Sequence, residues 1–419
     1  MKKLVALLLV LTMVATMSTV AFAEGKTVLT VASWDTTTGG YLIATEQAFE
    51  AAYPDIDLQY VDVASQEYYQ KSSIMLAGGD TTDVFDVKEL SDLQNWIEQG
   101  YVDSLESYVA ADSYDLTHYL GMEKYYRGAD AQLYALPYRS DFWVLFYNKT
   151  LFDKAGIACP TNDMTWDQYA DLALQMTSGE GIDKIYGTHY HTWLSAVANW
   201  AVNDGVYTLA DGNYEPLKYF YSLCQNLEDK GACQEFSELK AANLHYSAAF
   251  YQGNVAMMPM GYWFAATLIA EKAKSTFDFD WSFVSVPHKE DVAAGTSFGS
   301  LTGTCINKNA VHKDAAWKFI NWRCSEAGAQ AIAAVGTRPG YVSDAIAATM
   351  AAAEGFPADD AAKAALVPTG MGIEWPVGSN VSEIKTIVNE EHSLIMTREL
   401  SIDDGIAEMT ERVAQVLGK

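Results

Sequence analysis

The chain has few cysteines and few basic residues for its length. Only five cysteines occur among 419 residues, and they form neither a Cys-x-x-Cys pair nor a zinc-type set, so we expect no metal site. Cys224 and Cys233 are close enough in sequence to close a short loop, but free buried thiols are the default. Lysine and arginine number 27 against 54 acidic residues. The net charge of −27 argues against nucleic acid and anionic lipid surfaces as partners, because both need cationic patches.

After its first residues, the sequence has no apolar run long enough to cross a membrane. At the start, two lysines precede an apolar stretch, 4–14, and an Ala-x-Ala site stands before Glu24. This pattern is typical of a secretory signal peptide, here residues 1–23. We therefore expect a soluble, exported mature chain, either periplasmic or extracellular. The first cysteine is Cys159, so we expect no lipid anchor at the cleavage site.

Length and strand pattern predict an α/β protein with two lobes. A chain of 419 residues exceeds what one hydrophobic core normally serves. Residues 28–32 form an apolar run and residues 56–60 alternate with a period of two, while the segment between them has the apolar stripe of a helix. This order implies a right-handed crossover and a parallel sheet. Because ligands bind outside the carboxyl ends of such strands, Trp34 and Asp35 are candidate site residues.

The most informative stretch lies in the middle of the first half of the chain. We expect a loop of aromatic and ionic residues, 136–141, to enter a buried strand, 142–147. A loop that enters a core strand can place Tyr138, Arg139 and Asp141 at the rim of a crevice. These three side chains therefore become candidates for binding a ligand.

Several motifs, in this order along the chain, resemble the family 1 extracellular solute-binding proteins of bacterial ABC importers, which include the maltodextrin binders. The resemblance is carried by Leu136-Pro137-Tyr138, Tyr147-Asn148-Lys149, Gly253-x-x-Ala256-Met257, Gly261-x-Trp263 and Thr337-Arg338-Pro339-Gly340. The segment at Asp83 is similar too, but has Thr82 where the family usually has proline. Each motif is weak alone, whereas their order and spacing are specific and extend over nearly the whole mature chain.

The resemblance implies a two-lobe, periplasmic-binding-protein-like α/β fold with a ligand cleft between the lobes. The N-lobe would comprise residues 24–140 and 298–342, and the C-lobe residues 141–297 and 343–419, with a hinge of about three crossovers at these boundaries. Such a chain would act as the monomeric, extracytoplasmic substrate-binding protein of an ABC importer. It would bind a sugar or oligosaccharide by lobe closure and deliver it to the membrane permease. It would need neither a cofactor nor a catalytic residue.

A sugar site has a characteristic composition. The apolar face of a sugar ring packs on an indole, and its hydroxyls need partners such as Asp, Glu, Arg and Asn. The resemblance implies that Trp263 lines the cleft and that the strand after Asp83 touches ligand at its far end. Gly299 and Ser300 either contact ligand through their backbone or permit hinge bending. The predicted ligand-binding residues are Trp34, Asp35, Asp86, Lys88, Tyr138, Arg139, Asp141, His191, Trp193, Trp263, Gly299, Ser300, Glu374 and Trp375.

Other functions stay open at this level. Tryptophans beside acids also bind cations, so the same fold could hold a polyamine, a peptide, a phosphorylated sugar or a metal chelate. A secreted glycan-acting enzyme could use an acid pair such as Asp83 with Asp86, or Glu390 with Glu391, although no nucleophile elbow or metal motif occurs. Asp80 and the two aspartates after it lack the alternating spacing of a calcium loop.

Overall fold

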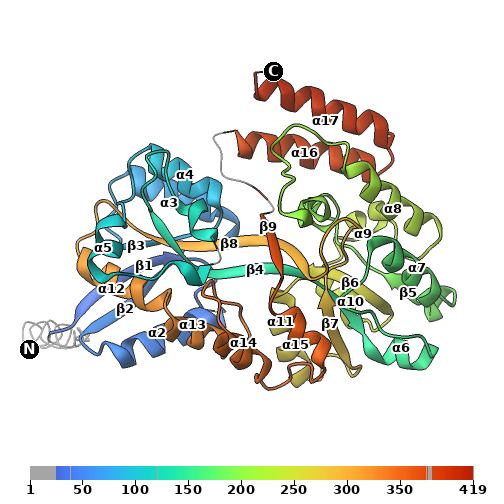
Figure 1. The fold of residues 1–419 in the computed structure, drawn as a ribbon, viewed down its shortest axis with the longest axis horizontal. Helices are drawn as coiled ribbons and strands as arrows, with labels where there is room; N and C mark the ends of the chain where they lie inside the picture. Colours follow the sequence, from blue (N-terminus) through green and yellow to red (C-terminus); the bar gives the residue numbers. More distant parts are fainter. Residues whose placement is uncertain (1–24, 38, 120, 374, 376–379, 419) are drawn as a thin grey trace, which may run out of the picture.

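The structure is a computed structural model that describes residues 25–37, 39–119, 121–373, 375 and 380–418. The predicted signal peptide and Glu374 lie outside these ranges. Two α/β lobes lie side by side and are connected by long strands (Figure 1). Among the described residues, no helix is both long enough and apolar enough to cross a membrane.

The strands form one mixed sheet in the order β2-β1-β3-β8-β4-β6-β5, with β7 beside β4 and β9 beside β8. Their bounds are β1 Thr27–Ser33, β2 Ile56–Asp62, β3 Val84–Val87, β4 Ala135–Asn148, β5 Tyr186–Thr188, β6 Val255–Gly261, β7 Trp281–Ser285, β8 Thr296–Ile306 and β9 Gly370–Ile373. The helices of the first lobe are α2 Gly40–Ala52, α3 Tyr68–Ala77, α4 Leu90–Glu98, α5 Glu106–Asp112, α12 Lys313–Arg323 and α13 Glu326–Ala333. The helices of the second lobe are α6 Lys149–Ala155, α7 Trp166–Met176, α8 Leu217–Asp229, α9 Phe236–Ala242, α10 Tyr246–Tyr251, α11 Trp263–Ala273, α14 Asp344–Ala351, α15 Asp360–Ala365, α16 Val381–Met396 and α17 Ile402–Val416.

The predicted strand–helix–strand unit at the start of the chain is confirmed. β1 pairs in parallel with β2 along its whole length, and α2 connects them and buries Leu42, Thr45 and Phe49. β3 lies parallel to β1 on its other side, whereas β8 is antiparallel to β3. Trp34 and Asp35 follow the carboxyl end of β1, where a parallel sheet leaves room for a ligand.

The buried apolar residues form two separate clusters. The first is built mainly from residues before 140 and from residues 301–332. The second is built mainly from residues 142–298 and 346–413. A chain of this length thus divides its core, as surface-to-volume scaling favours.

Both long central strands pass from one cluster to the other. Along β4 the change falls between Tyr138 and Phe142, and along β8 it falls between Phe298 and Leu301. Figure 1 shows β4 and β8 running side by side across the middle of the molecule. We propose that the two clusters are the cores of the N-lobe and C-lobe with the boundaries predicted above.

β4 differs from the prediction at its start. Residues 136–141, predicted as a loop, belong to this strand, which is continuous from Ala135 to Asn148. Antiparallel pairing with β8 extends through the segment, with an irregularity between Pro137 and Arg139. Proline has no N–H to donate and is tolerated at such a bulge. The proline that indicates a loop in the sequence therefore marks a bulge within a strand.

A third segment, residues 338–340, lies beside these strands. The backbone N–H of Ser140 donates to the carbonyl of Arg338 at 3.3 Å, and that of Gly340 donates to the carbonyl of Tyr138 at 3.0 Å. The Arg338 side chain also donates to Ser140 Oγ at 2.6 Å. The segment 338–340 is thereby attached to β4 where the two cores meet.

Gly299 allows β4 and β8 to approach each other at this crossing. A Cβ atom at residue 299 would collide with the backbone carbonyl of Asp141. Because backbone atoms of a paired strand cannot move aside as a flexible side chain can, only glycine fits here.

We expect Gly299→Ala to lower the free energy of unfolding by about 1–3 kcal/mol, the usual cost of overpacking. Urea denaturation measures the change. Gly370→Ala on β9 is the matched control, because a Cβ there would meet Thr296 Cγ2 at 3.5 Å, an ordinary contact. Equal effects of the two substitutions would contradict the steric explanation.

Candidate ligand-binding site

A cavity of about 750 Å³ lies between the two lobes, within the size range of small-molecule sites. Its walls come from the carboxyl ends of β1 and β3, from the crossing of β4 and β8, and from several segments of the second lobe. The predicted residues that line it are Trp34, Asp35, Lys88, Arg139, Asp141, Trp193, Trp263, Gly299, Ser300 and Trp375. The structure thus brings most of the predicted site together, although these residues are far apart in sequence.

Arg139 and Asp141 form an ion pair in the wall of this cavity. They stand two residues apart on β4, so strand alternation gives both side chains the same face. Arg139 Nε lies 3.5 Å from Asp141 Oδ2, and Arg139 Nη2 donates to Thr302 Oγ1 at 3.4 Å. Burial raises the pKa of Asp141, while Arg139 and Arg338 oppose that shift. The pair therefore presents oriented donors and acceptors to the cavity.

Trp34 lies between two cationic side chains in the first lobe. Its ring contacts Tyr68 edge-on at a centroid distance of 4.8 Å. Lys88 Nζ lies 5.4 Å from the Trp34 ring centroid, and the Arg139 guanidinium lies 6.0 Å from it. Lys88 Nζ also donates to the carbonyl oxygen and the hydroxyl of Ser65, at 2.7 and 2.8 Å. These contacts hold the indole and the ammonium group in fixed positions.

The second lobe contributes an aromatic wall. Trp263 packs edge-on against Trp143 at 5.8 Å between centroids, and its indole N–H donates to Tyr246 OH at 3.2 Å. Gly261 makes this orientation possible, because a Cβ there would collide with the Trp263 ring. Trp193, with 40% of its surface exposed, contacts the same Tyr246 edge-on at 5.5 Å.

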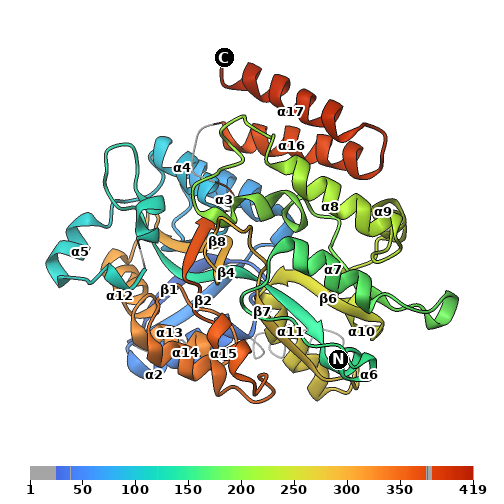
Figure 2. The same ribbon diagram turned by 45° about the vertical axis from the view of Figure 1, so that its right-hand side comes forward.

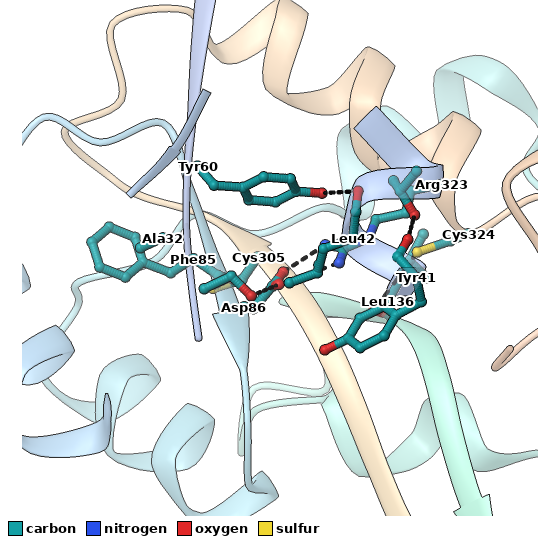
Figure 3. Close-up of polar contacts among 12 residues, drawn as sticks. Ala32, Tyr41, Leu42, Tyr60, Phe85, Asp86, Leu136, Cys305, Arg323 and Cys324 are labelled. Atoms are coloured by element: carbon teal, nitrogen blue, oxygen red, sulfur yellow. Dashed lines mark hydrogen bonds and ion pairs between the residues drawn. The ribbon is translucent and has the colours of Figure 1, made fainter. Parts of the chain in front are cut away.

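The structure places Asp86 and Tyr138 in the core of the first lobe instead of the cavity. Asp86 is fully buried and accepts hydrogen bonds from Arg323 at 2.6 and 3.3 Å and from Ser33 Oγ at 2.7 Å. Figure 3 shows this buried polar cluster, in which Arg323 lies close to Asp86. The Arg323 guanidinium lies 3.4 Å from the centroid of the Tyr138 ring.

The reasons for these two corrections are local. β3 ends at Val87, so the alternation that would give Asp86 and Lys88 one common face does not continue to Lys88. Tyr138 stands at the irregularity of β4 and packs against the core, whereas Arg139 beside it lines the cavity. We therefore remove Asp86 and Tyr138 from the candidate site.

His191 supports the site from behind. It is 7% exposed and contacts the Trp193 ring edge-on at 4.5 Å. Burial, together with nearby His245, lowers the pKa of His191 to about 4, so the imidazole is neutral near pH 7. It therefore orients Trp193 and does not line the cavity.

The acidic groups that suggested other chemistry have structural partners. Asp83 accepts hydrogen bonds from Thr30 and from the backbone N–H of His312. Glu390 and Glu391 both pair with Arg412. Among the described residues, no group of histidine, cysteine and acidic side chains is arranged to hold a metal ion. All five cysteines, including Cys224 and Cys233, are free thiols.

Sequence reasoning missed some lining residues, namely Ser65, Glu89, Leu90, Ser91, Leu301, Thr302, Ile373 and Lys385. Glu89 follows Lys88 directly, and Thr302 shares a strand face with Ser300, so adjacency and alternation are signals for both. Lys385 has no such signal, because α16 reaches the cavity only through the packing of the lobes.

Among the residues that the structure describes, the charges that line the cavity cancel. Asp35, Glu89 and Asp141 face Lys88, Arg139 and Lys385, three acidic residues against three basic ones. This balance contrasts with the net charge of −27 for the whole chain. The described lining is therefore polar and rich in hydrogen-bonding groups, and its acidic and basic side chains are equal in number.

Comparison with known proteins identifies a family and several proteins of similar fold. Residues 34–330 match the family described as bacterial extracellular solute-binding protein. A sugar transporter of Rhizobium etli, solved in an open conformation, is 38% identical with a TM-score of 0.86, over 92% of this chain and 99% of the other. An ABC substrate-binding protein of Listeria monocytogenes in complex with cycloalternan has the same fold, at 21% identity and a TM-score of 0.77 over 94% of this chain and 99% of the other. A mannitol-binding protein of Pseudomonas aeruginosa is 24% identical over 94% of each chain.

We expect Arg323→Met to lower the free energy of unfolding by about 3–5 kcal/mol, because it leaves the Asp86 carboxylate buried without a counter-ion. Arg127→Met, which breaks an exposed pair with Glu106, is the control and should cost no more than about 1 kcal/mol. Urea denaturation measures both. A loss in Arg323→Met as small as that of the control would mean that Asp86 is accessible to water.

Proposed function

This chain belongs to the bacterial extracellular solute-binding protein family, and we propose that its interlobe cavity binds a neutral carbohydrate. The bound sugar is delivered to the membrane permease of an ABC importer and is not chemically changed. The protein works outside the cytoplasm, as a monomer and without a cofactor. Its relatives include a mannitol-binding protein and a substrate-binding protein in complex with cycloalternan, which supports this choice of ligand class.

The observation that carries the proposal is the combination of indole rings with balanced charge in one cavity. A neutral sugar has an apolar face for the indoles of Trp34, Trp193, Trp263 and Trp375, and hydroxyls for the ionic groups. A polyamine would favour an excess of acid, and a phosphorylated sugar an excess of base. The lining residues that the structure describes have neither excess.

Four of the ionic groups have a direct role in this proposal. Asp35 and Asp141 accept hydrogen bonds from sugar hydroxyls, and Lys88 and Arg139 donate to them. Ser300 adds a hydroxyl, and the strands at Gly299 form the floor. An unsatisfied polar group in a closed cleft costs about 1–3 kcal/mol, so the array selects a ligand whose hydroxyls match it. A micromolar dissociation constant corresponds to a binding free energy of only about −8 kcal/mol.

Ligand binding is coupled to closure of the lobes. The lining residues come from both lobes, and β4, β8 and the segment 338–340 connect them at the floor of the cavity. A ligand that contacts both lobes favours the arrangement in which both contacts are made. We infer that these connections act as the hinge.

We expect sugars that raise the melting temperature of the wild-type protein to raise it less in Trp263→Ala, since bound ligand stabilises the folded state. Removal of one indole platform should weaken sugar binding by about twofold to tenfold. A thermal-shift screen with monosaccharides, sugar alcohols and oligosaccharides, with spermidine alongside, measures the effect. Trp322→Ala is the control, since that ring packs against Phe49 at 5.4 Å, away from the cavity.

Stabilisation of the wild type by spermidine and by no sugar would overturn the proposed ligand class. An equal loss of sugar response in Trp322→Ala would mean that Trp263 acts through stability alone.

We expect any sugar that binds to be recovered unchanged after prolonged incubation with the protein. In the described residues the acid pairs considered from the sequence are occupied by structural partners, so they are not free to protonate a glycosidic bond. Anion-exchange chromatography of the incubated sugar tests this. Formation of shorter products by the purified protein would contradict the absence of catalysis.

A further inference from the structure

A second cavity, of about 330 Å³, adjoins the proposed sugar site. The two cavities share the lining residues Ser65, Lys88, Glu89, Ser91, Trp375 and Lys385. Beyond this shared wall, the second cavity is lined by hydrogen-bonding side chains that include Tyr69, Asn95, Thr386 and Asn389. Its lining comes from α3 and α4 of the first lobe and from α16 of the second, helices that lie in the upper half of Figure 2.

The shared wall contains an ion pair that joins the two lobes. Lys385 Nζ of α16 lies 3.1 Å from Glu89 Oε2, just before α4. The same ammonium group lies 5.7 Å from the centroid of the Trp375 ring. The two partners are 296 residues apart in sequence, and each lines both cavities. The pair therefore stands in the wall that the two cavities share.

Lys88, the neighbouring cation in the shared wall, makes its contacts within the first lobe. Lys88 donates to two oxygen atoms of Ser65 in its own lobe, so its position does not depend on the other lobe. The side chains of Lys385 and Glu89 are 34% and 50% exposed, and an exposed ion pair adds little to stability. Such a pair is too weak to hold the lobes closed, and it can separate at little cost in free energy.

We propose that the Glu89–Lys385 ion pair is a specificity-determining gate that sets the length of the bound sugar. This inference rests on the proposed function of the larger cavity. A monosaccharide in that cavity leaves the pair intact. A longer linear sugar separates the pair and extends into the second cavity, where amide and hydroxyl groups bind its further hydroxyls.

The test compares ligand length in variants that open the gate. Glu89→Gln, Lys385→Met and the double variant are titrated calorimetrically with the one-, two- and three-unit sugars of the glucose, mannose and arabinose series. In each single variant the ratio of the trisaccharide Kd to the monosaccharide Kd should fall by about twofold to fivefold, the range expected for an exposed ion pair. The ratio in the double variant should equal that in the single variants, because each single substitution already breaks the pair.

Glu106→Gln is the matched control. Its pair with Arg127 has the same separation, 3.1 Å, and side chains 30% and 49% exposed, but neither residue lines the ligand cavity. This substitution should leave the Kd ratio unchanged.

An unchanged ratio in the two single variants, with sugars still binding, would overturn the gate and leave the proposed function standing. The gate would also be overturned if each single variant lost affinity equally for sugars of all lengths and the losses added in the double variant. That result would mean that each residue contacts the first sugar unit separately. Failure of the wild type to bind any of these sugars would overturn the proposed function and the gate together.

Discussion

The antiparallel pairing of β4 with β8 is the constraint on which the other features depend. Each strand begins in one hydrophobic core and ends in the other, so the pairing fixes how far apart the cores can be. The close approach at Gly299 places β8 directly against the backbone of Asp141. Arg139, Asp141, Ser300 and Thr302 line the cavity from the same two strands. The connection between the lobes and the floor of the candidate site are therefore one piece of structure, and a change in the lobe angle necessarily moves the groups that contact ligand.

Two ionic clusters, one in the first lobe and one where the lobes meet, differ in exposure to solvent. Asp86 and Arg323 are fully buried and hydrogen-bonded to each other, so they organise the core and do not contact a ligand in the cavity. Ser33, which donates to Asp86, immediately precedes Trp34. The buried cluster thus positions the end of β1 from behind, while Arg139 and Asp141 face the cavity. Residue type alone does not separate these roles, because both clusters combine an arginine, an aspartate and aromatic rings.

Much of the fold could be predicted because it follows from local patterns. Period-two alternation and an apolar helical stripe located β1, α2 and β2, and the order of these elements implied their parallel pairing. Trp34 and Asp35 followed from the position of a strand end. The errors arose where long-range pairing overrode a local signal. Pro137 indicated a loop, but β8 supplied a full-length partner that includes it in a strand with a bulge.

The sequence by itself determined the α/β class, the presence of two cores and the types of side chain available for a sugar, because these depend on periodicity, chain length and composition. The resemblance to a family added the order of the segments. Only the tertiary structure decided which acids are buried and which are free to meet a ligand, because desolvation depends on everything packed around a group. It alone also brought Lys385 of the last helices to Glu89, across 296 residues, because contacts between lobes depend on how whole domains pack and leave no local pattern in the chain.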